Sequence, residues 1–366
     1  ISSKKINLPP KDMSSNVLSK SAIVLFHSHD VRLHDNVALQ MASHHNRKHV
    51  IPVFLWSKKE QGPWGVRGCL EVVLKDALCN LDRKLNQYGL KLICREGDDS
   101  STMLRELCEE CSDIGAVYWN KEHTPESRLR EEKYQAVLQE IGVESLQCQS
   151  SLLYDPTSPS LAAGFHGGHW GTLMPFKRTC EKQLDEPRRP IPRAETFFML
   201  ECMEGPTNWP ASKAIDELDM AVINGNDKWS TPIMERFPMS EDAAIANMNS
   251  FIKYGFEKYE RDRSRADIEW ATSKLSAHLR IGTLSPNTLY YKIEDSNLDY
   301  NERKTISRRL IWRDLAYFHL YSFPSMRDTS IRLHYEQTEW CSGKEEQVRF
   351  NAWKSGQTGY PLVDAG

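Results

Sequence analysis

A short stretch rich in hydroxyl groups has the residue types and spacing of an anion site. Thr272-Ser273-Lys274-Leu275-Ser276 places three hydroxyls and a lysine at the entrance of an expected helix. Free N–H groups at a helix start meet the positive end of the helix dipole, which favours phosphate. The same Thr/Ser-rich pattern also caps helices that bind no ligand. The stretch therefore indicates either a phosphate site or an ordinary helix cap.

A second stretch, Arg308-Arg309-Leu310-Ile311-Trp312-Arg313-Asp314, combines cations with an aromatic ring. Between positions 301 and 334 there are seven Lys or Arg residues against three acids, so the segment is locally basic. An arginine beside a tryptophan can pair with a phosphate while the ring stacks on a base or a flavin. A solvated helix face with Trp312 in the core would give the same pattern, and both interpretations stay open.

The elements that must position these residues fall into two classes. The first third of the chain alternates short β-branched or apolar runs with helix-length segments, which predicts parallel strands with crossover helices. No Gly-x-Gly-x-x-Gly and no P-loop sequence is present, which disfavours a plain dehydrogenase or kinase. The expected strands are 22–27, 50–56, 91–95, 116–120 and 145–149, with helices at 69–85 and 126–142.

Beyond these strands the pattern becomes helical. We expect an α/β fold, in which an N-terminal doubly wound parallel-sheet domain is followed by an all-α domain, incomplete here. Helices are predicted at 243–260, 272–279, 286–294 and 307–321. The predicted organisation is a disordered extension at 1–20, the α/β domain at 21–153, a Pro- and Gly-rich linker at 154–240, and the helical domain at 241–366.

Composition says less about the class of protein than the motifs and the periodicity do. The net charge of -3 says nothing about a polyanionic partner, because binding patches are local. No apolar run reaches the length of a membrane span, so we expect no membrane association. Nine scattered cysteines are a poor disulfide framework and favour an intracellular location, in nucleus, cytoplasm or organelle. Cys108 and Cys111 lack a second pair, so we expect no metal site there, and His27, His29 and His34 cluster at the end of an expected strand.

Six motifs in register resemble the DNA photolyase/cryptochrome family of blue-light flavoproteins. The resemblance extends over nearly the whole chain and implies an α/β domain followed by a helical domain that binds FAD. It also implies an antenna pigment of the folate or deazaflavin type, which the region after Asn120 leaves unresolved. The motifs are His29–Asn36, Trp119-Asn120, Thr172–Phe176, Thr272–Ser276, Leu310–Arg313 and Thr358–Ala365.

The resemblance assigns roles to individual residues. Trp312 matches the aromatic residue that packs against a flipped pyrimidine dimer in the repair enzymes, and flipping costs least for a damaged pair. Trp340 matches, with a different spacing, the outer end of an electron-transfer chain. Arg308 and Arg309 belong to a basic flank expected to bind the DNA backbone. The residues that match FAD contacts are Tyr259, Thr272, Ser273, Lys274, Leu275, Ser276 and Arg313.

Three differences from the family pattern bear on function. The repair branch has a glutamate three residues before the tryptophan, where this chain has Arg309. The carboxylate after Trp312-Arg313 is Asp314 rather than the commoner glutamate. The family continues into further helices where this sequence stops at Gly366, so we expect residues 1–366 alone to bind FAD poorly.

Three functions follow as alternatives. Trp312 and the basic flank favour light-driven repair of UV-induced pyrimidine dimers by a photolyase, whose partner is damaged DNA. Arg309 favours a cryptochrome photoreceptor that acts on signalling proteins. A degenerate fragment with only a nucleic-acid-binding or structural role is the third. In each case a monomer is expected.

Overall fold

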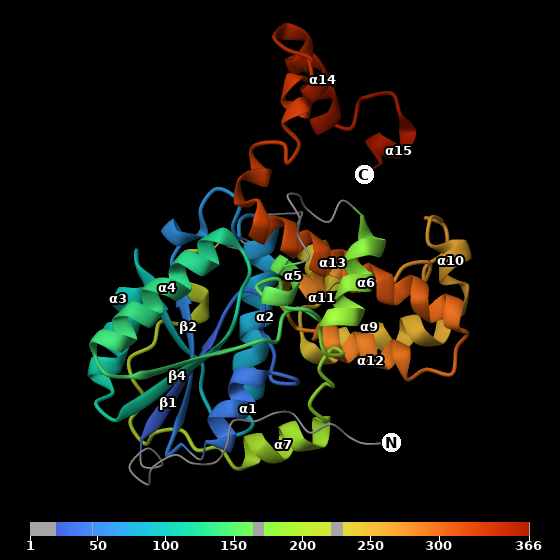
Figure 1. Cartoon of the computed structure of the whole chain (residues 1–366). Coiled ribbons are helices and arrows are strands. Elements are labelled where there is room, and N and C mark those ends of the chain that lie inside the picture. The colour runs from blue at the N-terminus through green and yellow to red at the C-terminus, as the bar shows by residue number, and fades with distance from the viewer. Residues whose placement is uncertain (1–19, 46, 164–171, 221–229, 366) are drawn as a thin grey trace. The chain divides into compact units, whose positions relative to one another are not determined.

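The computed structural model describes residues 20–45, 47–163, 172–220 and 230–365, in two units that meet at Ser322 and Phe323 (Figure 1). The predicted extension at 1–20 therefore lies, up to residue 19, outside the described residues. None of the described helices is long and apolar enough to cross a membrane. The nine cysteines all lie in the described ranges and are free thiols.

Five parallel strands form one sheet in the order β3-β2-β1-β4-β5, which confirms the predicted fold class. Because β1 pairs with both β2 and β4, the strand order reverses between β1 and β4. Ligands of such sheets usually bind in the crevice at the carboxyl ends of β1 and β4. The strands are β1 (Ser21–Phe26), β2 (Val50–Trp56), β3 (Ile93–Glu96), β4 (Ile114–Asn120) and β5 (Glu144–Cys148).

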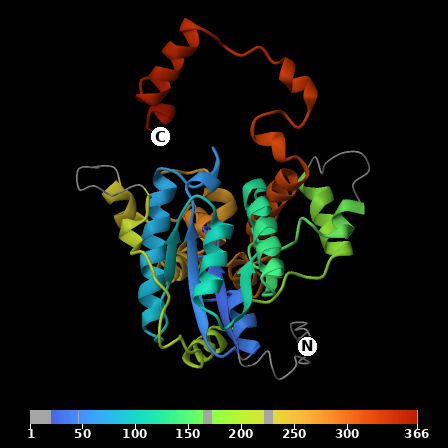
Figure 2. The same ribbon diagram turned by 90° about the vertical axis from the view of Figure 1, so that its left-hand side faces the viewer.

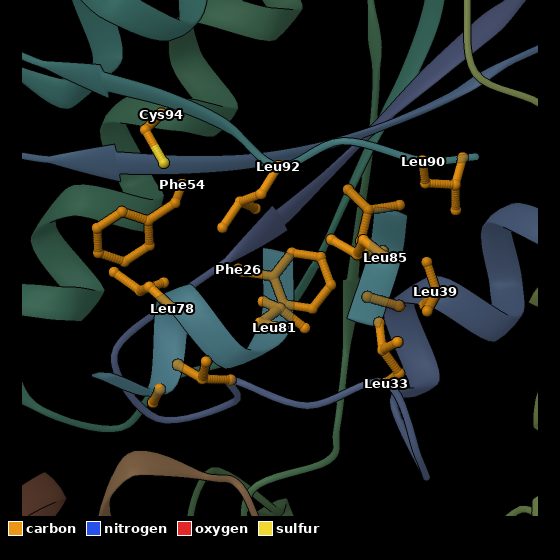
Figure 3. Close-up of a cluster of buried hydrophobic side chains, with 14 of the residues drawn as sticks. Phe26, Leu33, Leu39, Phe54, Leu78, Leu81, Leu85, Leu90, Leu92 and Cys94 are labelled. Atoms are coloured by element: carbon orange, nitrogen blue, oxygen red, sulfur yellow. The ribbon is translucent and has the colours of Figure 1, made fainter. Parts of the chain in front are cut away.

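Helices cover both faces of the sheet because successive strand residues point in opposite directions. In β1, Val24 and Phe26 pack toward α1 (Val37–His44) and α2 (Cys69–Asn86), in the cluster drawn in Figure 3. The alternate residues Ile23 and Leu25 pack on the other face, toward α3 (Ser100–Glu110) and α4 (Pro125–Glu140). Figure 2 looks onto that second face.

The segment predicted as a linker, 154–240, contributes to two cores. Leu161 and Phe176 belong to the helical core, whereas Leu200 and Met239 belong to the core between the sheet and α2. Its helices are α5 (Pro159–Ala163), α6 (Leu173–Gln183), α7 (Arg193–Glu201) and α8 (Ser230–Arg236).

The helical domain follows the predicted order with two differences. The helix expected over 243–260 ends at Tyr254, and Gly255 follows, where the carbonyl oxygen of Trp270 approaches so closely that a Cβ would lie 2.0 Å from it. The helix expected from Thr272 begins only at Ser276, after Lys274 adopts a left-handed conformation with φ +55°. The helices are α9 (Glu241–Tyr254), α10 (Tyr259–Asp262), α11 (Ser276–Ile281), α12 (Pro286–Glu294) and α13 (Tyr300–Ser322).

The second unit begins at Phe323 and contains α14 (Lys344–Lys354) and α15 (Pro361–Asp364). Its last turn is closed by Asp364, whose carboxylate accepts hydrogen bonds from the N–H groups of Thr358 at 2.7 Å and Gly359 at 3.0 Å. These hydrogen bonds close the turn formed by Gly356-Gln357-Thr358-Gly359.

The loop after β1 joins the sheet to the helical domain. The buried guanidinium of Arg32 donates to the carbonyl of Gly282 at 3.1 Å and to the hydroxyl of Ser150 at 2.5 Å. The buried carboxylate of Asp35 accepts from Arg188 at 2.6 Å, and the Ser285 hydroxyl donates to its other oxygen. Charges at this depth persist only when they are paired and hydrogen-bonded.

Two more carboxylates hold the domains together. Glu241, the first residue of α9, accepts from the N–H groups of Leu33 at 2.7 Å and His34 at 3.1 Å. Asp314 on α13 accepts from the N–H groups of Leu153 and Tyr154, each at 2.9 Å. Asp314 therefore fixes α13, and every side chain on it, against the segment that leaves β5.

We predict that Gly282→Ala strongly destabilises the protein. A Cβ at this residue would lie 1.9 Å from the carbonyl oxygen of His29, and its φ of +82° disfavours any side chain. Gly89→Ala is the matched control, because Gly89 has φ +70° but open space around a Cβ. In urea unfolding we expect a loss of about 1 kcal/mol for Gly89→Ala and of at least about 3 kcal/mol for Gly282→Ala. Equal losses would contradict the close approach.

We also predict that Asp314 makes stability depend on pH. Burial raises the pKa of Asp314 to about 7, against the opposing effects of Arg313 and the two backbone N–H groups. The native state therefore holds this proton more tightly than the unfolded chain does. The stabilisation is present below about pH 4 and is lost as the pH rises through about 7.

Asp314→Asn, which cannot titrate, isolates this effect. The unfolding free energy of the unaltered protein relative to the variant should fall by on the order of 4 kcal/mol between pH 4 and 7. Parallel pH profiles for the two proteins would contradict the assignment.

Candidate functional site

A cavity of about 410 Å³ lies among the helices of the first unit. Residues from α9, α10, α11, α12 and α13 contribute to its wall, so it exists only when these helices are packed together. The lining residues are Phe251, Tyr259, Ser273, Ser276, Leu279, Arg280, Leu289, Ile306, Arg309, Leu310, Arg313 and Tyr317.

The cavity brings together five of the residues singled out from the sequence. Tyr259, Ser273, Ser276 and Arg313, predicted as FAD contacts, line it with Arg309, which was predicted to contact DNA. Between the earliest and the latest of these residues the chain passes through α11 and α12. The hydroxyl-rich stretch and the basic aromatic stretch thus form parts of one site.

The remaining predicted FAD contacts do not line the cavity. The Lys274 ammonium group pairs with Glu269 at 3.1 Å and lies 4.5 Å from the ring centre of Trp270. Leu275 is buried in the helical core, and the side chain of Thr272 is exposed. At Leu275, therefore, only the backbone could contact a ligand. The roles of these three residues stay predictions.

Two arginines of the cavity are anchored from the α/β domain. The Arg313 guanidinium donates to the carbonyl of Ser151 at 2.7 Å and lies 5.2 Å from the ring centre of Tyr317. Arg280 donates to the imidazole of His29 at 2.7 Å. Within the described part of the chain, the guanidinium of Arg309 has no such partner. The cations of the cavity therefore differ in how firmly they are held.

Arg280 and Tyr317 are site residues that the sequence prediction missed. Arg280 follows Ser276 by four residues, and Tyr317 follows Arg313 by four. Residues at this spacing lie on the same face of a helix, so the spacing alone could have identified both. The apolar members of the wall, such as Leu289 and Ile306, had no signal that distinguishes them from ordinary core residues.

Trp312 lies on α13, three residues after Arg309 and next to Arg313. Both arginines line the cavity, whereas Trp312 is not among the described residues that line it. Its side chain is 46% exposed, which is unusual for an aromatic residue of this size. The core interpretation of Trp312 is therefore wrong. Arg308 is partly buried on the same helix.

Trp340 belongs to the second unit, where its side chain is 83% exposed. Its role in electron transfer stays a prediction. Elsewhere in the described ranges, no group of three or more His, Cys, Asp or Glu residues is arranged to hold a metal ion.

The chemistry of the wall suits FAD. Phe251, Leu279, Leu289, Ile306 and Leu310 offer apolar surface to an aromatic ring system, and two serine hydroxyls and three arginines offer partners to phosphate. None of the described residues that line the cavity is acidic. An anionic cofactor with a large ring system would therefore meet complementary groups.

Two family models match the chain. The model described as DNA photolyase matches residues 22–195, and the model described as FAD binding domain of DNA photolyase matches residues 306–366. Together they cover more than half of the chain. The second model includes α13, which carries Arg309, Trp312 and Arg313.

Individual relatives fall into two named classes. A deoxyribodipyrimidine photo-lyase from Agrobacterium fabrum is 26% identical over 95% of this chain and 69% of its own length. Cryptochrome-1 from Arabidopsis thaliana is 24% identical over 94% of this chain and 49% of its own length. The crystal structure of a class III photolyase from Agrobacterium tumefaciens matches with a TM-score of 0.81 and 27% identity, covering 95% of this chain and 68% of that one.

The sheet topology, the helical domain and the two family models agree with the resemblance found in the sequence. The chain belongs to the DNA photolyase/cryptochrome family and carries that family's FAD-binding domain.

Proposed function

We propose that this protein repairs pyrimidine dimers in DNA with blue light. The observation that carries the proposal is on α13, where the exposed Trp312 comes between Arg309 and Arg313 in the sequence, and both of these arginines line the cavity. An exposed aromatic ring beside cations is the combination that binds an unstacked base together with its phosphate.

FAD, when bound, supplies a chromophore that absorbs blue light and exchanges an electron. Ser273, Ser276 and Arg313 would hold its anionic part, because they are the hydroxyl and guanidinium groups that line the cavity. Tyr259 and the apolar wall would exclude water from its ring system. The anchoring of Arg313 by Ser151 keeps one of these cations in place before the cofactor arrives.

On the DNA side, Trp312 would stack against the flipped dimer, and Arg308 and Arg309 would contact the backbone. Arg309 stands where the repair branch has a glutamate. A guanidinium offers N–H donors in a planar fork that matches the oxygens of a phosphate group. We therefore assign it a phosphate contact, which its exposed position permits.

Relatives named as photolyases support repair. They include proteins from Agrobacterium fabrum and Escherichia coli that match more than nine-tenths of this chain at 26% and 27% identity. Cryptochromes of plants also match at similar identity, so photoreceptor signalling is the alternative that the experiment must distinguish.

We predict that repair depends on light and on Trp312. Oligonucleotides that contain one cyclobutane dimer or one 6-4 dimer are incubated with flavin-loaded protein, in light and in darkness. Trp312→Ala should lower the light-dependent repair rate about tenfold or more, because stacking of a base on an aromatic ring contributes about 1–3 kcal/mol. Flavin occupancy should not change.

The matched control is Phe198→Ala, which removes another exposed aromatic ring, on α7. It should repair at the rate of the unaltered protein. Absence of repair from fully flavin-loaded, photoreducible protein would reject the proposal and favour a photoreceptor.

We further predict that Arg309 binds phosphate and not the lesion. Arg309→Gln should weaken binding to damaged and undamaged DNA by the same factor, and reduce the slope of log affinity against log salt by about 1. Arg83→Gln, on the exposed side of α2 in the α/β domain, is the control and should leave the slope unchanged. A loss confined to damaged DNA would instead assign Arg309 to the lesion.

A further inference from the structure

The edge of the α/β domain contacts the cavity through one buried histidine. His29 follows β1 and is 9% exposed. Its Nδ1 lies 2.5 Å from a carboxylate oxygen of Glu122, which follows β4, and its Nε2 lies 2.7 Å from the guanidinium of Arg280. Arg280 in turn lines the cavity. The three side chains thus connect the carboxyl end of the sheet to the cofactor site.

These two contacts allow only one form of the His29 ring. A guanidinium has N–H donors and no acceptor, so Nε2 must be the unprotonated nitrogen that accepts from Arg280. Nδ1 must then carry the proton and donate it to Glu122. Burial, the largest effect, lowers the pKa of His29, and Arg280 lowers it further, which agrees with a neutral ring. The Ser28 hydroxyl, 3.1 Å from Nδ1, makes a second and longer contact.

The carboxylate that orients the ring is itself fixed. Glu122 is buried, and its second oxygen is paired with Arg130 of α4. Burial acts to raise the pKa of Glu122, but the guanidinium of Arg130 and the hydrogen bond from His29 outweigh it and lower that pKa well below its usual value. Glu122 therefore stays an anion that can accept only, and the direction of the hydrogen bonds from His29 to Glu122 and from Arg280 to His29 is set by the protein alone.

We propose that His29, oriented by Glu122, is a positioning residue that holds the guanidinium of Arg280 in the cavity wall for the cofactor. The inference goes beyond the proposed repair function, because it requires FAD binding but no reaction with DNA. A long flexible cation loses conformational freedom when it binds a phosphate or a ring. An arginine held beforehand loses less, so the cofactor binds more tightly.

The first test is a double-mutant cycle on the FAD dissociation constant, measured by titrating apoprotein with FAD. His29→Leu removes the acceptor for Arg280, and we expect the dissociation constant to rise five- to tenfold. His29→Gln, whose amide oxygen can replace Nε2 as acceptor, should restore most of the affinity. If His29 acts through Arg280, then His29→Leu should have little further effect in an Arg280→Gln background.

His27→Leu is the matched control. His27 is two residues away in the same loop and is equally buried, but neither ring nitrogen has a hydrogen-bond partner among the described residues. This substitution should leave FAD affinity within twofold. The proposal would be overturned if His29→Leu lowered FAD affinity equally in the Arg280 and Arg280→Gln backgrounds. It would also be overturned if His29→Leu left FAD affinity unchanged.

The second test uses the unaltered protein without cofactor, so it does not depend on whether a variant folds. The ¹⁵N chemical shifts of the His29 ring in the unaltered apoprotein at pH 7 should identify a protonated Nδ1 and an unprotonated Nε2. A protonated Nε2 would reject the positioning role. Absence of DNA repair, in contrast, would reject only the proposed function and leave both of these results unaffected.

Discussion

The structure depends on two buried charged side chains in the loop after β1. Arg32 and Asp35 are both almost fully buried, and their partners come from three separate parts of the chain, at 150, 188–191 and 282–285. Asp35 forms an ion pair with Arg188, and removing one member of a buried ion pair leaves the other without compensation, which is among the most costly changes a protein can undergo. The loop therefore permits one relative position of sheet, linker and helical domain. The partners of Arg32 and Asp35 are Ser150, Arg188, Ile191, Gly282 and Ser285.

The contacts of Arg32 and Asp35 also fix the helices that form the cavity. Gly282 ends α11, which carries Ser276 and Arg280, and Ser285 begins α12, which carries Leu289. Asp314 fixes α13 to the segment after β5 in the same manner. The α/β domain thus does more than adjoin the cofactor site. It determines where the helices that form the site begin and end, and it supplies the groups that anchor Arg280 and Arg313.

Much of this fold could be predicted from the sequence, because strands and amphipathic helices record their burial in their own periodicity. All five strands were located within about two residues of their observed ends. The helical pattern does not predict the break at Gly255, where the Trp270 carbonyl occupies the space that a Cβ would need, which is a tertiary contact. The late start of α11 was also missed, because nothing in the local sequence requires Lys274 to be left-handed.

The site was predictable to the extent that it is contained in two short motifs. Ser273, Ser276 and Arg313 came from motif recognition, whereas Arg280 gains its importance from His29, which is far away in sequence. In the sequence Asp314 is only a shorter substitute for glutamate, whereas its two backbone partners show that a hydrogen-bond acceptor is needed there. Contacts between domains leave no periodic signal, so this part of the site needed the structure.

We propose that FAD binds in the cavity among α9 to α13. Amide hydrogen exchange, compared with and without FAD, tests this placement most directly. We expect slower exchange in peptides that cover 272–281 and 306–317, while peptides from α3, which packs on the far face of the sheet, exchange at the same rate in both states. FAD binding that leaves both cavity peptides unprotected, or that protects only segments outside them, would contradict it.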